Sequence, residues 1–278
     1  MALADRYGVL LVDVDGTVTR GAEPVGGAAE VVRTLHERGR RLAFVTNNST
    51  RAPEEVVTHL KDVGIDARVD EIVTSAMATA SVLAERSVGT AFVVGERALR
   101  SSLESAGITV VDGDGAGQPP DVVVVGLDRG ATYASLRSAC LYVQRGADLV
   151  ATGPDTSYPE PEGLSPGTGA LTALVTATTG AEPLVIGKPF PGLLVAARNA
   201  AIRAGADGEP LVVGDRLDTD VAGAAGLGWD SLLVLTGVVR DRETAVASPW
   251  RPTYIGNDLR ALLIEPEPDE VLTDTGSR

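Results

Sequence analysis

The stretch VLLVDVDGTV, residues 9–18, decides how this chain folds. Its first half is a continuous apolar run, which is typical of a strand buried on both faces of a parallel sheet. Asp13 and Asp15 follow, and because side chains alternate along a strand we expect both on the same side. Two carboxylates at the end of a buried strand are costly unless a cation or a proton partners them. The stretch therefore predicts a functional site at the end of a strand in a parallel sheet.

The same pattern recurs along the chain, where short β-branched runs ending on a polar residue or glycine alternate with longer segments of helical spacing. This alternation predicts a parallel sheet covered by helices. The predicted strands are residues 9–13, 41–46, 91–95, 122–126, 184–187, 211–215 and 232–236. The predicted helices are residues 53–63, 97–106, 131–145 and 191–204, and a glycine follows each of them. The proline-rich segment Gly153–Gly169 is predicted to be a loop, either a lid or binding loop or a plain surface excursion.

A second carboxylate cluster follows another apolar run, in LVVGDRLDTD at residues 211–220. Ligands of open parallel sheets bind outside the carboxyl ends of the strands, so we expect Asp215 beside Asp13 and Asp15. Three carboxylates there would form an oxygen cage of the kind that holds Mg²⁺ when waters and a phosphate complete its octahedron. Ca²⁺ is less favoured because the sequence lacks a twelve-residue loop of alternating oxygen ligands.

Two further strand ends carry groups that suit a phosphate. Thr46-Asn47-Asn48 closes the second strand with a hydroxyl and amides, and Lys188 follows the run Leu184–Gly187. Each signal alone is weak, because Thr-Asn-Asn is commonly a turn or a helix cap and a lysine after a strand is usually a solvated charge. The four strand ends together, in this order, are a specific pattern.

That ordered set resembles the haloacid dehalogenase-like phosphatase superfamily. DVDGTV at residues 13–18, GDRLDTD at residues 214–220 and the long gap between Asn48 and Lys188 are most similar to its branch with a large α/β cap inserted between the second and third motifs. The resemblance extends from Tyr7 to about Asp258. It implies an α/β fold with a Rossmann-like parallel-sheet core and an inserted α/β cap. The expected core is residues 1–82 and 183–264, the expected cap is residues 83–182, and residues 265–278 are expected to be a disordered acidic tail.

The resemblance also implies roles for the motif residues. Asp13 would be the nucleophile that forms an aspartyl-phosphate. Asp15 would act as general acid and then general base, and its backbone carbonyl would help to ligate Mg²⁺. Thr46 and Asn47 would bind the phosphoryl oxygens, while Lys188 would neutralise the charge of the phosphoryl group and of Asp13.

The remaining site residues follow from the same resemblance. Asp215 would complete the metal ligands, and Asp220 would support that coordination sphere or orient the lysine. Gly16 would let the backbone pass close to the phosphate. In the cap loop, Asp155 and Tyr158 would face the part of the substrate beyond its phosphate, although Tyr158 could equally pack within an irregular loop.

The expected activity is Mg²⁺-dependent hydrolysis of a small phosphorylated metabolite. Glycerol 3-phosphate or 2-phosphoglycolate is favoured, because residues 214–220 and the cap resemble that subgroup. Nucleoside monophosphates and pyridoxal 5′-phosphate are alternatives, since the core motifs bind only the phosphate. Other classes are a phosphotransferase or mutase and a phospho-accepting regulatory domain, the latter disfavoured because Asp15 promotes turnover. A homodimer formed through the cap is expected from the resemblance.

Charge and composition restrict the partners further. The chain carries a net charge of −14, which repels a phosphate backbone, so we expect no nucleic-acid partner. No apolar run is long enough to span a membrane, and the start MALADRYG lacks the pattern of a secretory signal. With the single cysteine Cys140, these features predict a cytoplasmic protein without a membrane partner. His36 and His59 are expected at exposed helix positions rather than as metal ligands.

Overall fold

The computed structural model describes residues 1–160 and 162–266. It divides them into two compact units. The first unit comprises Met1–Thr46, Pro53–Val73 and the described residues from Pro189 onward, and the second comprises Asn47–Ala52 and Thr74–Lys188. The second unit is therefore an insertion in the chain of the first. Of the predicted tail, residues 267–278 lie outside the described residues.

The first unit is built on a sheet with the strand order β15-β14-β13-β1-β4-β5. The strands are β1 (Val9–Asp13), β4 (Leu42–Thr46), β5 (Ile72–Thr74), β13 (Pro210–Gly214), β14 (Asp230–Val234) and β15 (Tyr254–Gly256). β1 pairs in parallel with β13 on one side and with β4 on the other, and β14 and β15 continue the parallel order. Because the chain runs from β1 to β4 and returns later at β13, the carboxyl ends of β1 and β13 flank a topological switch point.

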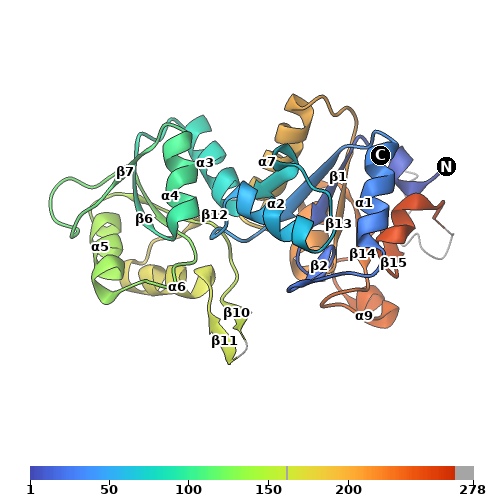
Figure 1. Ribbon diagram of the computed structural model, residues 1–278. Coiled ribbons are helices and arrows are strands. Elements are labelled where there is room, and N and C mark those ends of the chain that lie inside the picture. Colours follow the sequence, from blue (N-terminus) through green and yellow to red (C-terminus); the bar gives the residue numbers. More distant parts are fainter. Residues whose placement is uncertain (161, 267–278) are drawn as a thin grey trace. The chain divides into compact units, whose positions relative to one another are not determined.

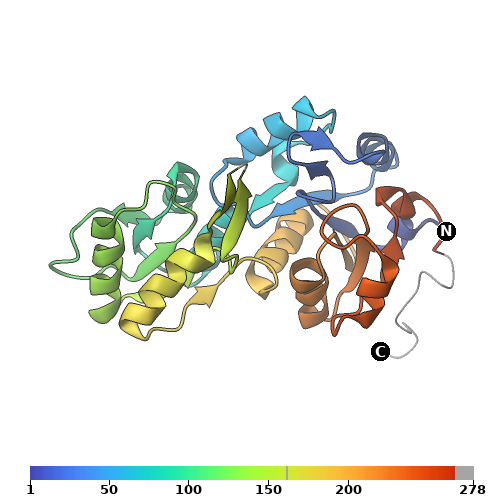
Figure 2. The ribbon, with the colours of Figure 1, turned by 90° about the horizontal axis from the view of Figure 1, so that it is seen from below.

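Helices cover both faces of this sheet. They are α1 (Ala28–Glu37), α2 (Pro53–Asp62), α7 (Pro191–Arg203), α8 (Ala222–Leu227) and α9 (Arg242–Ala247). Shorter elements are the turns η1 (Leu3–Arg6), η2 (Val69–Glu71) and η4 (Leu259–Leu263), the π-helical turn η3 (Leu217–Val221), and a hairpin of β2 (Thr19–Arg20) and β3 (Glu23–Pro24). The apolar sides of α1 and α2 share one buried cluster with Leu10 and Phe44, whereas α7 packs on β1 and β4 from the opposite face (Figure 2).

The second unit has its own sheet, with the order β12-β9-β8-β6-β7 and parallel pairing throughout. Its strands are β6 (Thr90–Val94), β7 (Thr109–Val111), β8 (Val122–Val125), β9 (Asp148–Ala151) and β12 (Leu184–Val185). Figure 1 shows α3 (Ser75–Glu85) and α4 (Arg97–Ser105) on one face of this sheet, and α5 (Tyr133–Gln144) and α6 (Thr168–Thr179) on the other. The unit is thus an α/β cap with a parallel sheet.

The second unit extends beyond the predicted cap range of residues 83–182 at both ends. At its start α3 packs against α4, and at its end β12 pairs with β9. Both elements therefore belong with the cap sheet by contact, although the predicted boundaries place β12 and most of α3 in the core.

The prediction of a loop over Gly153–Gly169 was wrong. β10 (Ser157–Glu160) and β11 (Gly163–Pro166) form an antiparallel hairpin there, with Ser157 opposite Pro166, and α6 begins at Thr168. Prolines argue against a central strand because they lack the N–H that a ladder needs. This two-stranded hairpin has unpaired outer edges, where that missing donor has no consequence.

The expectation that His36 is exposed was also wrong. Its side chain is 10% exposed, and Nε2 lies 2.8 Å from Oε1 of Glu71. The other carboxylate oxygen of Glu71 accepts a hydrogen bond of 3.0 Å from the backbone N–H of Arg68. His36 therefore joins α1 to the η2 turn. Within the described part of the chain, no helix combines the length and the apolar character that crossing a membrane demands.

Candidate functional site

Three aspartates, the aspartate cluster, meet at the carboxyl ends of β1 and β13. Asp13 is the last residue of β1, Asp215 directly follows β13, and Asp220 lies in η3. Each offers one carboxylate oxygen, and these oxygens all lie within 4.8 Å of one another. Asp215 and Asp220 are each 1% exposed and Asp13 is half-buried. The fold thus concentrates negative charge where water is largely excluded.

The aspartate cluster fits a divalent cation. Like charges at this separation repel, and burial removes most of the water that would screen them, so a cation is the partner that makes the arrangement favourable. An all-oxygen ligand set is the set that the hard cations Mg²⁺ and Ca²⁺ take in proteins. Asp13, Asp215 and Asp220 could therefore hold the metal.

The side chain of Asp15 lies outside the aspartate cluster, so the structure brings together two members of the expected cage, Asp13 and Asp215. β1 ends at Asp13 and the chain bends at Val14, so the alternation of a strand does not extend to Asp15, which is exposed. Asp220 takes the third place. The winding of η3 turns its carboxylate back, and Oδ2 accepts a hydrogen bond of 3.2 Å from the backbone N–H of Arg216.

Two glycines pack against the carboxylate of Asp215. Gly16 has a φ of +92°, in the left-handed region, and a Cβ there would overlap this carboxylate. A Cβ at Gly237 would overlap it too, and the backbone N–H of Val238 donates a hydrogen bond of 2.7 Å to its Oδ2. Gly237 and Val238 follow β14, the neighbour of β13, and sequence reasoning missed both. The signal that could have found them is the Thr236-Gly237 step at the end of a predicted strand.

Thr46 lies next to the aspartate cluster in the sheet. It is the last residue of β4 and is 5% exposed. Its neighbour in the chain, Val45, is the register partner of Asp13. The first unit therefore brings together five of the predicted site residues at one edge of its sheet, namely Asp13, Gly16, Thr46, Asp215 and Asp220.

The second unit brings together Asn47, Asp155 and Lys188. Oδ1 of Asn47 accepts a hydrogen bond of 2.9 Å from the backbone N–H of Lys188. Nδ2 of Asn47 donates to the backbone oxygen of Lys188 at 3.1 Å and to Oδ2 of Asp155 at 3.0 Å. Lys188 itself is 3% exposed. These contacts between residues far apart in the sequence were not predictable from the motifs.

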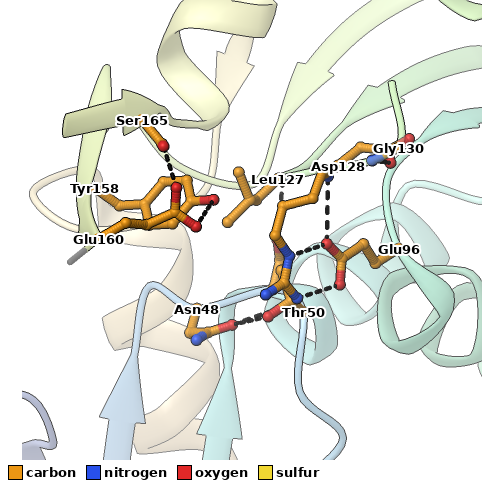
Figure 3. Close-up of polar contacts among 11 residues, drawn as sticks. Asn48, Thr50, Glu96, Leu127, Asp128, Gly130, Tyr158, Glu160 and Ser165 are labelled. Atoms are coloured by element: carbon orange, nitrogen blue, oxygen red, sulfur yellow. Dashed lines mark hydrogen bonds and ion pairs between the residues drawn. The ribbon is translucent and has the colours of Figure 1, made fainter. Parts of the chain in front are cut away.

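The loops at the carboxyl ends of β6 and β8 are joined by an ion pair (Figure 3). Nε and Nη2 of Arg129 donate to the two carboxylate oxygens of Glu96 at 2.7 and 2.8 Å. The hydrogen bond from Arg129 holds the pKa of Glu96 below its usual value, against the opposing effect of burial. The pair is therefore charged at neutral pH and fixes Arg129.

Tyr158 lies on the cap hairpin, which is β10 with β11. Its hydroxyl donates a hydrogen bond of 3.0 Å to Oε1 of Glu160, whose other oxygen accepts from Ser165 (Figure 3). Desolvation, together with the bond to Glu160, raises the pKa of the Tyr158 hydroxyl. Hydrogen bonds from Ser165 and Tyr158 lower the pKa of Glu160. The hairpin thus presents hydroxyl groups beside an ionised carboxylate.

The fold is an α/β core with a parallel sheet and an inserted α/β cap, and its site is a cluster of carboxylates that could hold a metal ion. A family model described as haloacid dehalogenase-like hydrolase matches residues 10–109, and a second, described as HAD-hydrolase-like, matches residues 185–262. The chain belongs to the haloacid dehalogenase-like hydrolase family.

Named relatives align along nearly the whole chain. The acid sugar phosphatase of Staphylococcus haemolyticus is 38% identical over 94% of this chain and 97% of its own length. A crystal structure of glycerol phosphate phosphatase from Mycobacterium tuberculosis in complex with magnesium is 40% identical, with a TM-score of 0.85 over 94% of this chain and 78% of that one. A crystal structure of 4-nitrophenylphosphatase from Thermotoga maritima is 32% identical, with a TM-score of 0.83 over 94% of this chain and 98% of that one.

Proposed function

We propose that this chain hydrolyses the phosphate esters of small polyols and sugars, glycerol 3-phosphate foremost, with Mg²⁺ held by the aspartate cluster. The protein is a phosphatase of the haloacid dehalogenase-like family. The observation that carries the proposal is the convergence of Asp13, Asp215 and Asp220 at the switch point between β1 and β13. When bound, Mg²⁺ would neutralise the negative charge of the phosphoryl oxygens and of the carboxylates around them.

The chemistry proceeds in two displacements at phosphorus. In the first, a carboxylate oxygen of Asp13 bonds to phosphorus, the bond from phosphorus to the ester oxygen breaks, and Asp15 protonates the departing alkoxide. In the second, Asp15 takes a proton from water, the water oxygen bonds to phosphorus, and the bond to Asp13 breaks. Inorganic phosphate is released, Asp13 returns to its carboxylate form and Asp15 to its protonated form, so each turnover consumes one water.

Thr46, Asn47 and Lys188 bind the phosphoryl group in this proposal. Thr46 and Asn47 are consecutive in the chain, with Thr46 at the end of β4 beside Asp13. The ammonium group of Lys188 offsets the charge of the phosphoryl group as it approaches Asp13. A divalent cation and one lysine together supply enough positive charge for an acidic protein to accept an anionic substrate.

The polar groups of the cap hairpin favour a neutral, hydroxylated leaving group. We place Tyr158 toward the part of the substrate beyond its phosphate, and the hairpin there carries two hydroxyl groups and the ionised carboxylate of Glu160. Hydroxyls of glycerol or a sugar can donate to that carboxylate, whereas the carboxylate of 2-phosphoglycolate would be repelled by it. The names of the relatives support the same choice.

The test is a panel of phosphate-release measurements with Mg²⁺ and with excess EDTA. The panel contains glycerol 3-phosphate, 2-phosphoglycolate, hexose phosphates, a nucleoside monophosphate, pyridoxal 5′-phosphate and 4-nitrophenyl phosphate. We expect Mg²⁺-dependent release with the highest kcat/KM on glycerol 3-phosphate or a sugar phosphate. A higher kcat/KM on the nucleotide, on pyridoxal 5′-phosphate or on 2-phosphoglycolate would overturn the substrate assignment. Turnover that needs an added alcohol acceptor would overturn hydrolysis in favour of phosphotransfer.

A further inference from the structure

We propose that Asn47 and Asp155 act as positioning residues that set the backbone of Lys188, with Asp155 acting through Asn47 rather than on the substrate. The inference rests on the proposed role of Lys188 in binding the phosphoryl group. It assigns to the cap loop after β9 a part in the phosphate-binding step, where the sequence indicated only recognition of the leaving group.

The side-chain amide of Asn47 forms hydrogen bonds with both backbone groups of Lys188, one on each side of its Cα. It accepts from the backbone N–H at 2.9 Å and donates to the backbone oxygen at 3.1 Å. A neighbouring strand would offer a peptide this same pair of bonds. β12 ends at Val185 and the last ladder bond in this stretch is from the N–H of Ile186 to the oxygen of Ala151 at 3.0 Å. Asn47 therefore makes, for Lys188, the backbone hydrogen bonds that a neighbouring strand would make in a sheet. These bonds fix the direction in which the Lys188 side chain leaves the backbone.

Asp155 decides which way round this amide stands. Its Oδ2 accepts the remaining N–H of Asn47 Nδ2 at 3.0 Å. With the amide turned over, the oxygen of Asn47 would face both this carboxylate and the backbone oxygen of Lys188, leaving two acceptor pairs with no hydrogen between them. The negative charge of Asp155 thus selects the orientation that serves Lys188.

The surrounding backbone is arranged to hold this contact. The hydroxyl of Ser75, a buried residue at the start of α3, donates a hydrogen bond of 2.7 Å to the backbone oxygen of Asn47. Gly187 lies so close that a Cβ there would come within 2.8 Å of Oδ1 of Asn47 and 2.6 Å of the backbone oxygen of Thr152. The donors and one acceptor site of the Asn47 side chain are thereby engaged by Lys188 and Asp155, which leaves phosphate binding at this position to its main chain.

The first test separates positioning from recognition of the leaving group. Asp155→Ala removes the orienting acceptor, and we expect kcat/KM to fall about 10- to 100-fold, the usual effect of a displaced binding group. Because Lys188 binds the phosphate that all substrates share, the loss should be equal for glycerol 3-phosphate and 4-nitrophenyl phosphate. Asp155→Asn can still accept from Asn47 and should stay within about threefold of the parent protein. The exposed Asp148 on β9 supplies the matched control, Asp148→Ala, which should leave kcat/KM unchanged for both substrates.

The second test exchanges donor and acceptor. Asn47→Asp sets two carboxylates against each other and should lose more activity than Asp155→Ala. Adding Asp155→Asn restores a donor opposite an acceptor at residue 155 but not at the backbone oxygen of Lys188, so the double variant should be more active than Asn47→Asp alone and less active than the parent protein. A purely structural role predicts a lower Tm without that recovery of kcat.

Two results would overturn the inference. One is an Asp155→Ala loss confined to glycerol 3-phosphate, which would mean that Asp155 touches the leaving group. The other is unchanged kinetics of a folded Asp155→Ala protein while Lys188→Ala is inactive. Full activity of Lys188→Ala is a different outcome, because it would remove the proposed role of Lys188 and with it the basis of this inference.

Discussion

Gly237→Ala should weaken the proposed metal site although none of the three aspartates is substituted. A Cβ at this position would overlap Oδ2 and Cγ of Asp215, so the carboxylate must move by roughly 1 Å or more to regain an ordinary contact distance. The movement also strains the 2.7 Å hydrogen bond from Val238 to Oδ2. The backbone of Gly237 is outside the left-handed region, so the effect is steric alone. Disturbing the support of a ligand typically costs about 10- to 100-fold in metal affinity, or about 1.4–2.8 kcal/mol.

The assay is a Mg²⁺ titration of 4-nitrophenyl phosphate hydrolysis at saturating substrate. We expect the half-saturating Mg²⁺ concentration to rise by that factor, and the increase of Tm caused by Mg²⁺ to shrink. The matched control is Gly226→Ala in α8, where a Cβ would meet no atom within 4 Å, and it should titrate like the parent protein. A folded Gly237→Ala protein with an unchanged Mg²⁺ titration would show that the contact between Gly237 and the Asp215 carboxylate does not support metal binding.

Two further predictions concern stability. Backbone hydrogen bonds from Thr90 and Gly89 lower the pKa of Asp121, so its contribution is complete above the ordinary value of about 4 and is lost as the pH falls below it. Asp121→Asn should therefore lower Tm more at pH 7 than at pH 3, and an equal effect at both pH values would contradict this. Glu71→Ala removes the acceptor of two part-buried contacts, from the His36 ring and from the backbone N–H of Arg68, and should cost about 1–3 kcal/mol of unfolding free energy in urea. A loss below about 0.5 kcal/mol would show that water replaces that acceptor.

The long apolar strands and the helices α2, α4, α5 and α7 were predictable from the sequence. Four strands are buried on both faces of their sheets, namely β1, β4, β8 and β13. Because both faces are buried, each strand has a continuous apolar sequence that can be recognised without the structure. α6 was missed because its threonines are weak helix formers. Its packing against α5 and against the cap hairpin supplies the stability that propensity does not. The cap hairpin was not predicted because its prolines are more typical of a loop than of a strand.

The site was predictable where a strand delivers a side chain and less so where a turn does. Asp13 and Asp215 follow directly from the ends of β1 and β13, and the structure brings them together. The position of Asp15 could not be read from strand alternation, because the bend at Val14 ends the strand first. Asp220 depends on the π-helical winding of η3, and no periodicity rule anticipates that winding. Asp220 was identified as a site residue only by the resemblance to the family, because the spacing of the sequence does not indicate it.

In the proposed mechanism Asp13 attacks phosphorus, and phosphate release by Asp13→Asn in saturating Mg²⁺ tests this role. The substitution keeps the shape of the side chain and removes one of three crowded charges, so we expect the variant to fold with an undiminished Tm. We expect kcat to fall at least about 10³-fold on every substrate that the parent protein hydrolyses. A folded Asp13→Asn protein that retains activity within about tenfold of the parent would show that the nucleophile lies elsewhere.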